Sequence, residues 1–132
     1  TIREIKGYIF SRPFMGERCP QNIQNIVLRD YCQKINCEYL LSGTEYAMQN
    51  SYLMLQQVID EIPSIDGIVF YSLFQMPETQ KHRLQIYENI LDKNGEIHFA
   101  LENLKITAQS EIERVENIWL VRQTMPDCLT HI

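Results

Sequence analysis

The hydrophobic pattern centres on one short run, Ile68–Tyr71, in which β-branched and aromatic residues succeed one another without polar interruption. Pro63 interrupts the chain before this run, and Pro77 begins a helical pattern after it. A short apolar run bounded in this way is typical of a strand buried on both faces at the centre of a parallel sheet. We therefore expect the remaining elements to be strands beside it or helices over it.

Four other stretches have the length and residue types of strands. They are Ile5–Phe10, Glu38–Leu41, Ile97–Leu101 and the short Leu104–Ile106. Between the strands, apolar residues recur at helical spacing. The predicted helices run over Pro20–Ile35, from a cap at Asn50 or Ser51 to Ile62, from Pro77 to Asn94-Gly95, and from Ser110 through Arg122. Ser110 and Glu113 have the spacing of a capping box, and Gly95 suits a left-handed helix end.

The order of these elements predicts the fold class. Strands that alternate with helices imply right-handed crossovers and a mostly parallel sheet of four or five strands. We predict an open three-layer α/β/α sandwich of flavodoxin-like or resolvase-catalytic-domain-like form. In a chain of 132 residues this is one α/β domain over 1–123, with an irregular tail over 124–132. Ligands of such sheets bind outside the carboxyl ends of the strands, near the switch in strand order.

Polar residues come directly after the predicted strands at that edge, and they form the candidate site. Ser11 and Arg12 come after the first strand, a predicted loop over 42–46 after the second, and Ser72 after the third. Arg12 could hold a carboxylate or phosphate with two parallel hydrogen bonds. Ser11 could act as a nucleophile, and Glu45 or Glu102 as an acid or base. The ligand-binding candidates are Ser42, Gly43, Thr44, Tyr46 and Ser72.

Each of these candidates also has a purely structural interpretation. Ser11 suits a turn, Arg12 and the carboxylates suit a solvated surface, and the 42–46 segment suits an ordinary strand-to-helix loop. No histidine can be assigned as a base for Ser11, so a Ser-His-Asp triad has no support.

Composition and motifs exclude several classes of function. The net charge of −5 does not suit a protein that neutralises nucleic-acid phosphates with a broad basic surface. Neither GxGxxG nor GxxxxGK[ST] occurs, and no close Cys/His/Asp/Glu cluster suggests a metal, so we predict neither a metal nor a cofactor. No apolar run is long enough for a membrane span, and the first residues do not resemble a secretion signal. We therefore expect a cytoplasmic protein whose four cysteines (Cys19, Cys32, Cys37 and Cys128) are reduced thiols.

The last predicted helix carries four consecutive apolar residues, Ile118–Val121. Such a run covers more of the helix circumference than one core-facing stripe needs. We predict a homodimer through the helix around Ile112–Val121. The alternative is a helix that is simply well buried within the monomer.

Several motifs resemble the catalytic domain of serine recombinases of the resolvase/invertase type. They are Gly7-Tyr8-Ile9-Phe10-Ser11, Gln24, Ser42-Gly43 and Asp66-Gly67-Ile68-Val69. The resemblance implies a mainly parallel sheet, a nucleophilic serine at Ser11 and a dimerisation helix. Arginines of that family are replaced here: Ile9 stands two residues before the serine, and Leu73-Phe74-Gln75-Met76 stands after the third strand. Phosphoryl transfer to serine needs several cations around the phosphate, which argues against recombination.

Motifs over nearly the whole chain resemble a second family, the sporadic carbohydrate cluster proteins of bacteria. They include Ser11-Arg12-Pro13-Phe14, Arg29-Asp30-Tyr31-Cys32, Thr44-Glu45-Tyr46-Ala47-Met48, Tyr71-Ser72-Leu73-Phe74 and Val115-Glu116-Asn117-Ile118-Trp119-Leu120. This resemblance implies a cytoplasmic role in making or modifying surface glycans.

These observations lead to three hypotheses: an enzyme or binding protein for a sugar or sugar nucleotide, a non-catalytic interaction module on a recombinase-like scaffold, and, least favoured, an active recombinase.

Overall fold

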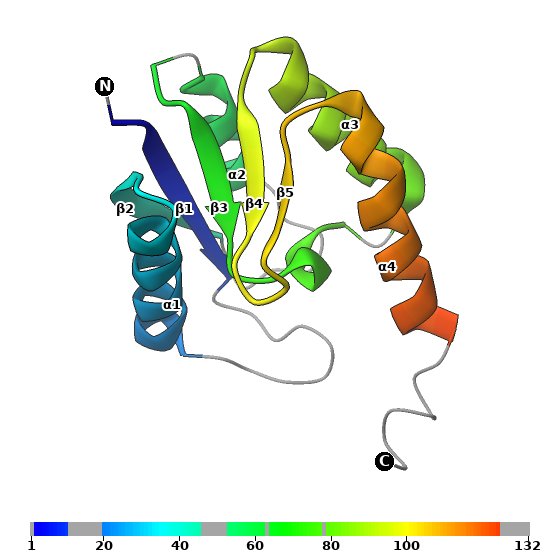
Figure 1. The fold of residues 1–132 in the computed structure, drawn as a ribbon, viewed down its shortest axis with the longest axis horizontal. Helices are drawn as coiled ribbons and strands as arrows, with labels where there is room; N and C mark the ends of the chain where they lie inside the picture. The colour runs from blue at the N-terminus through cyan, green and yellow to red at the C-terminus, as the bar shows by residue number, and fades with distance from the viewer. Residues whose placement is uncertain (1, 11–19, 46–52, 63, 78, 125–132) are drawn as a thin grey trace.

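The sheet has five strands in the order β2-β1-β3-β4-β5, as the computed structural model shows (Figure 1). The structure describes residues 2–10, 20–45, 53–62, 64–77 and 79–124. The strands are β1 Glu4–Phe10, β2 Glu38–Glu45, β3 Gly67–Phe70, β4 Glu96–Phe99 and β5 Leu104–Ile106. The first four are parallel, and β5 runs antiparallel to β4. The predicted mostly parallel sheet is thereby confirmed, with β3 at its centre.

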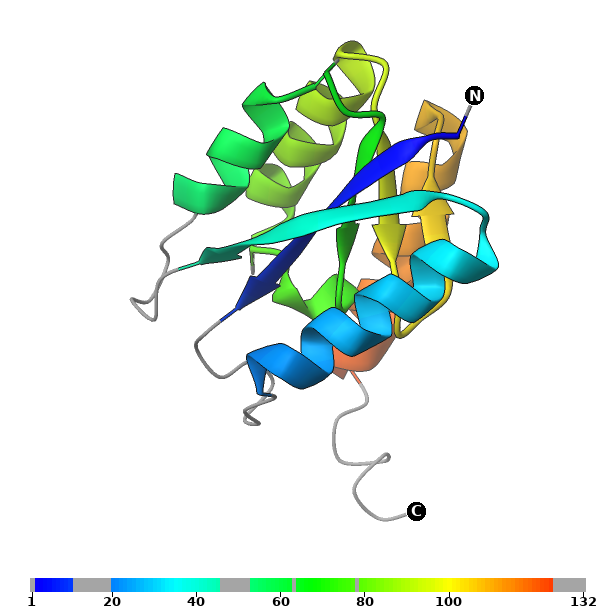
Figure 2. The same ribbon diagram turned by 90° about the vertical axis from the view of Figure 1, so that its left-hand side faces the viewer.

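Helices cover both faces of this sheet. The helix α1 (Gln21–Lys34) packs on one face, and α2 (Leu53–Asp60), α3 (Gln80–Asp92) and α4 (Ile112–Thr124) contribute to the core on the other (Figures 1 and 2). The chain goes from β1 outward to β2 and then crosses back to β3 on the other side of β1. The reversal of strand order therefore lies between β1 and β3, where this type of sheet opens for ligands.

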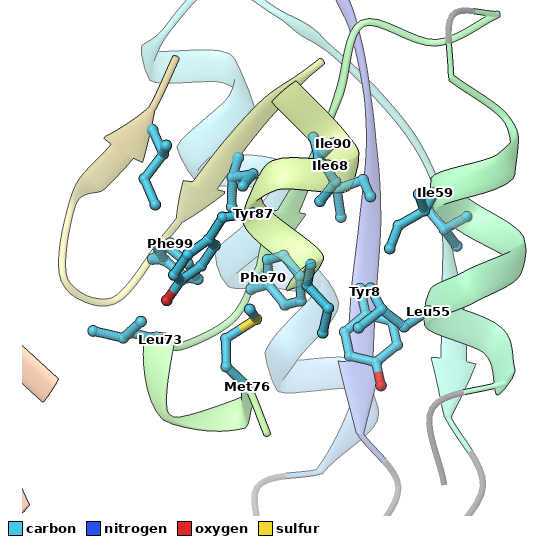
Figure 3. Packing of buried hydrophobic residues seen from close by; sticks show 14 of the residues in the cluster. Tyr8, Leu55, Ile59, Ile68, Phe70, Leu73, Met76, Tyr87, Ile90 and Phe99 are labelled. Carbon is cyan, nitrogen blue, oxygen red and sulfur yellow. The ribbon is translucent and has the colours of Figure 1, made fainter. Parts of the chain in front are cut away.

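The larger core is built around aromatic rings from three neighbouring strands, Tyr8 meeting Phe70 edge to face and Phe70 stacking on Phe99. The ring centroids of Tyr8 and Phe70 lie 5.3 Å apart, and those of Phe70 and Phe99 lie 5.4 Å apart (Figure 3). Along β3, Ile68 and Phe70 belong to this core, whereas Val69 belongs to the core under α1. All four residues of β3 are buried, as predicted from its unbroken apolar run.

The predicted loop over 42–46 is wrong for residues 42–45, which belong to β2. Their backbone pairs with β1 up to Phe10 and Glu45. Lys6 pairs with Leu40 and Tyr8 with Gly43, so β2 carries one extra residue and forms a bulge opposite β1. The free backbone edge of β1 offers ladder hydrogen bonds, and these outweigh the turn-forming preference of the Ser42-Gly43 dipeptide.

The chain between β3 and α3 also differs from the prediction. A short 3₁₀ helix, η1 (Leu73–Gln75), lies between them, and α3 begins at Gln80 rather than at Pro77. Ser72 caps η1 and forms a capping box with Gln75.

Three helix-end details are corrected as well. Ser110 lies inside a second 3₁₀ helix, η2 (Gln109–Glu111), and the capping bond runs instead from the Thr107 backbone N–H to Glu111 Oε1 at 2.8 Å. After α3, Asn94 takes the left-handed conformation, with φ of 63°. Gly95 is needed for close packing, since a Cβ there would lie 2.8 Å from Ile62 Cδ1. Thr124 belongs to α4 rather than to the tail, and 125–132 lie outside the described residues.

Candidate functional site

The predicted site residues divide into those that the structure describes and those that it does not. Ser11, Arg12 and Tyr46 lie outside the described residues. Ser42, Gly43, Thr44 and Glu45 are described in their backbone, within β2. Gly43 of β2 and Phe70 of β3 both pair with Tyr8 of β1. Glu45 lies two residues after Gly43, and Ser72 lies two residues after Phe70. The backbone at Glu45 and at Ser72 therefore reaches the same carboxyl edge, as predicted from the fold.

Ser72 is built into that edge rather than exposed on it. Its side chain is 2% exposed. The Ser72 hydroxyl donates to Glu102 Oε2 at 2.8 Å and accepts from the backbone N–H of Phe74 at 3.1 Å. The hydroxyl predicted to line a pocket thus holds the first turn of η1.

Glu102 closes the same turn from the neighbouring connection between β4 and β5. Its second oxygen, Oε1, accepts from the backbone N–H of Leu73 at 2.8 Å. The N–H groups at the start of a helical turn are natural anion ligands, and here an internal carboxylate occupies one of them. Glu102 is therefore partly buried and has a structural role. The alternative interpretation from the sequence, in which it is a solvated surface carboxylate, is wrong.

A buried pair of amides extends this network to the other face of the sheet. Gln75 Nε2 donates to Gln24 Oε1 at 2.9 Å, and both side chains are at most 1% exposed. Gln75 Oε1 lies 3.5 Å from the backbone nitrogen of Ser72. We call Gln24, Ser72, Gln75 and Glu102 the edge network. The Ser-x-x-Gln spacing of Ser72 and Gln75 was the signal in the sequence that could have found it.

A second polar network joins α3 to α4 and is buried. The Arg83 guanidinium donates to both Glu116 oxygens, through Nε at 2.9 Å and Nη2 at 2.8 Å, and it lies 3.9 Å from the ring centre of Trp119. The Tyr87 hydroxyl also donates to Glu116, and burial together with this carboxylate raises the pKa of Tyr87. Removing one partner of such a buried pair typically costs about 3–5 kcal/mol, because the other charge is left uncompensated. Arg83 is thus a structural cation.

A third network crosses the α1 face. The Tyr31 hydroxyl lies 2.8 Å from His98 Nδ1, and His98 Nε2 lies 2.9 Å from Glu96 Oε1. Glu96 also forms an ion pair with Arg3 at 2.6 Å. The arrangement assigns the imidazole proton to Nε2, with Tyr31 donating to Nδ1. Burial lowers the pKa of His98 and raises the pKa of Tyr31 to about 12. Both side chains are therefore neutral near pH 7.

A hollow in the surface of the protein lies away from the predicted site. A hollow of about 410 Å³ lies at the opposite, amino edge of the sheet, lined in part by Asn94, Gly95, Glu96 and Thr107. It is well open to solvent and contains none of the predicted site residues. Within the described part of the chain, no group of three or more His, Cys, Asp or Glu side chains could hold a metal ion. No described helix has the length and apolarity to span a membrane.

Comparison with known proteins identifies the class of fold. No family model matches the chain, and no curated protein matches it. Among solved structures, the N-terminal catalytic domain of TP901-1 integrase aligns with a TM-score of 0.71 over 96% of this chain and 98% of that one, at 11% identity. A resolvase family site-specific recombinase from Streptococcus pneumoniae aligns with a TM-score of 0.62 over 96% and 97%, also at 11% identity. The chain therefore has the resolvase catalytic-domain fold. A sequence identity of 11% supports the shared fold and nothing further.

The lowered pKa of His98 predicts a stability loss on mild acidification. The unfolded chain takes up a proton at this residue near pH 6.5, whereas the folded chain does so only at lower pH, so protons favour unfolding as the pH falls below about 6.5. Between pH 7 and pH 5.5, the wild type should lose about 1 kcal/mol more unfolding free energy than His98→Gln in urea denaturation. Equal slopes in wild type and His98→Gln would contradict the assignment.

Proposed function

We propose that this protein works by binding rather than by cleaving DNA strands, and that the carboxyl edge of its sheet takes a neutral, hydroxyl-rich ligand such as a sugar. The single observation that carries the proposal is the closure of the turn after β3 by Glu102. In the cytoplasm, such a protein would serve the making or modification of surface glycans, which is the role that the resemblance to sporadic carbohydrate cluster proteins implies.

The edge network does not suit a phosphodiester. Its four members are two amides, a hydroxyl and a carboxylate, and none carries positive charge. A phosphate brought to the start of η1 would meet the negative charge of Glu102 in place of the cations that phosphoryl transfer requires. Arg83, the arginine nearest in sequence after β3, is paired with Glu116.

The same edge suits sugar hydroxyls. A carboxylate accepts hydrogen bonds from hydroxyls, and an aromatic side chain beside it offers an apolar face for a sugar ring. Tyr71 is partly buried at this edge, and its backbone carbonyl accepts from Leu101, the residue before Glu102, at 3.0 Å. The backbone of Tyr71 therefore pairs with the residue before Glu102, and the Tyr71 side chain packs against the core under α1.

Calorimetric titration with neutral sugars, sugar acids, sugar nucleotides and inorganic phosphate tests the proposal. We expect a neutral sugar or the sugar part of a nucleotide to bind, and inorganic phosphate not to bind. Glu102→Gln should weaken the binding about tenfold or more, because a hydrogen bond to a charged acceptor is lost. The matched control Glu113→Gln makes the same charge change at an exposed position of α4 and should leave the affinity unchanged.

Two results would refute the proposal. One is an absence of heat and of thermal shift with every sugar tested. The other is a covalent adduct between Ser11 and a DNA strand, trapped in a denaturing gel, which would restore the recombinase hypothesis.

A second candidate function, assembly with another copy of the chain, rests on α4. Ile112, Val115 and Trp119 of this helix are buried in the core, whereas Leu120 and Val121 are 56% and 57% exposed. An exposed apolar pair at the end of a helix that also packs on the core suits a symmetric contact between two such helices.

Light scattering at increasing protein concentration tests this candidate. We expect a dimer whose dissociation constant rises at least about tenfold in Leu120→Lys, because a charge would be buried in an apolar contact. Ile26→Lys is the matched control, since Ile26 is a 62% exposed apolar residue on α1. A wild-type chain that stays monomeric at high concentration would contradict the candidate.

A further inference from the structure

The end of α1 brings two cysteines together in a defined backbone turn. The helix ends at Lys34 with Ile35 as its C-cap, and Asn36 comes next in the left-handed conformation with φ of 59°. The Asn36 N–H donates to the Gln33 carbonyl at 3.2 Å, and the Cys37 N–H donates to the Cys32 carbonyl at 2.8 Å. This pair of bonds is the Schellman motif, in which the side chains at Cys32 and Cys37 are the two positions that characteristically touch.

The hydrogen bond between these residues limits how far apart their backbones can lie. Adding about 1.46 Å from N to Cα of Cys37 and about 2.4 Å from carbonyl oxygen to Cα of Cys32 to the 2.8 Å bond gives at most about 6.7 Å between the two Cα atoms. Disulfides form across Cα separations of about 4.4–6.8 Å. The turn therefore holds the two Cα atoms within the separation that disulfides span.

The side chains share one environment as well. Cys32 and Cys37 belong to the same buried cluster under α1, together with Tyr31 and Val69. Both are free thiols in this structure. Cys32 is completely buried, whereas Cys37 is 8% exposed, so Cys37 is the thiol that a small reagent would reach first.

We propose that Cys32 and Cys37 are a reversible thiol–disulfide site, in which the disulfide cross-links the last turn of α1 to the residues that follow it. The co-reactant is a low-molecular-weight disulfide such as glutathione disulfide. The Cys37 thiolate attacks one sulfur of that molecule, which breaks its S–S bond, releases one small thiolate and leaves a mixed disulfide on Cys37. The Cys32 thiolate then attacks Cys37 Sγ and releases the second small thiolate. Two protein thiols are oxidised, one small disulfide is reduced to two thiols, and the two protons pass to the released thiolates.

Burial and nearby charges determine which thiol attacks first and how the rate depends on pH. Burial raises the pKa of Cys32 to about 12. Burial also raises the pKa of Cys37; the Arg3 guanidinium opposes that rise, whereas the Glu96 and Asp66 carboxylates add to it. Cys37 therefore supplies the attacking thiolate, and the reaction should accelerate as the pH is raised. The site lies at the far end of α1 from Gln24, so it is separate from the edge network and does not depend on the proposed function.

Equilibration of the folded protein with glutathione disulfide tests the site. After alkylation of remaining thiols, digestion with trypsin and a glutamate-specific protease cuts after Lys34 and Glu38. We expect the peptides 30–34 and 35–38 to remain linked and to separate on reduction with dithiothreitol. The rate of linkage should increase between pH 7 and pH 9. In Cys32→Ser, the reaction should stop at the mixed disulfide of Cys37 with glutathione.

Two controls keep the result decisive. The double variant Cys19→Ser/Cys128→Ser removes the other two cysteines and should give the same linked peptides. The mapping on the wild type needs no variant, so a poorly folded Cys32→Ser would not remove the test. Absence of linked 30–34 and 35–38 in natively folded wild type, or linkage of either cysteine to Cys19 or Cys128 instead, would overturn the proposal.

Discussion

The structure depends on the burial of β3 between β1 and β4. Each residue of this strand is enclosed, with Phe70 between the rings of Tyr8 and Phe99 on one face and Val69 under α1 on the other. Because β3 is parallel to both β1 and β4, the chain leaves it at the carboxyl edge that the three strands share. That edge is where the order of strands reverses, so the segment after Phe70 decides the chemistry of the site.

The turn after Phe70 satisfies its own hydrogen bonds. Ser72 and Glu102 bind the first N–H groups of η1, and Gln75 reaches across to Gln24 on α1. In the resolvase-type fold this chain shares, an edge able to transfer a phosphoryl group has to gather cations. Here the described side chains at the edge are a carboxylate and neutral groups, and this is the physical basis of the proposal that the ligand is hydroxyl-rich.

The sequence predicted the sheet well because its strands are either continuously apolar or flanked by strong turn residues. Ile68–Tyr71 and Leu104–Ile106 are examples, and the latter range matches β5 in full. Segment 42–45 escaped prediction because its pairing with β1 is a long-range interaction, and its polar composition does not reveal a bulged strand. Similarly, Glu102 lies 30 residues from Ser72, so local patterns could identify both as polar strand ends but not as hydrogen-bond partners. The networks of Arg83 with Glu116 and of Tyr31 with His98 were missed for the same reason.

Native-state hydrogen exchange at the backbone amides of Leu73 and Phe74 tests the closure of the edge most directly. If Glu102 and Ser72 close the turn after β3, both amides are protected in the wild type and lose protection in Glu102→Ala, while the amides of Ile68, Val69 and Phe70 in the buried strand keep theirs. Exchange of the Leu73 amide in the wild type at the rate of an unstructured peptide would show that the edge is open, and it would contradict the closure on which the proposed binding site rests.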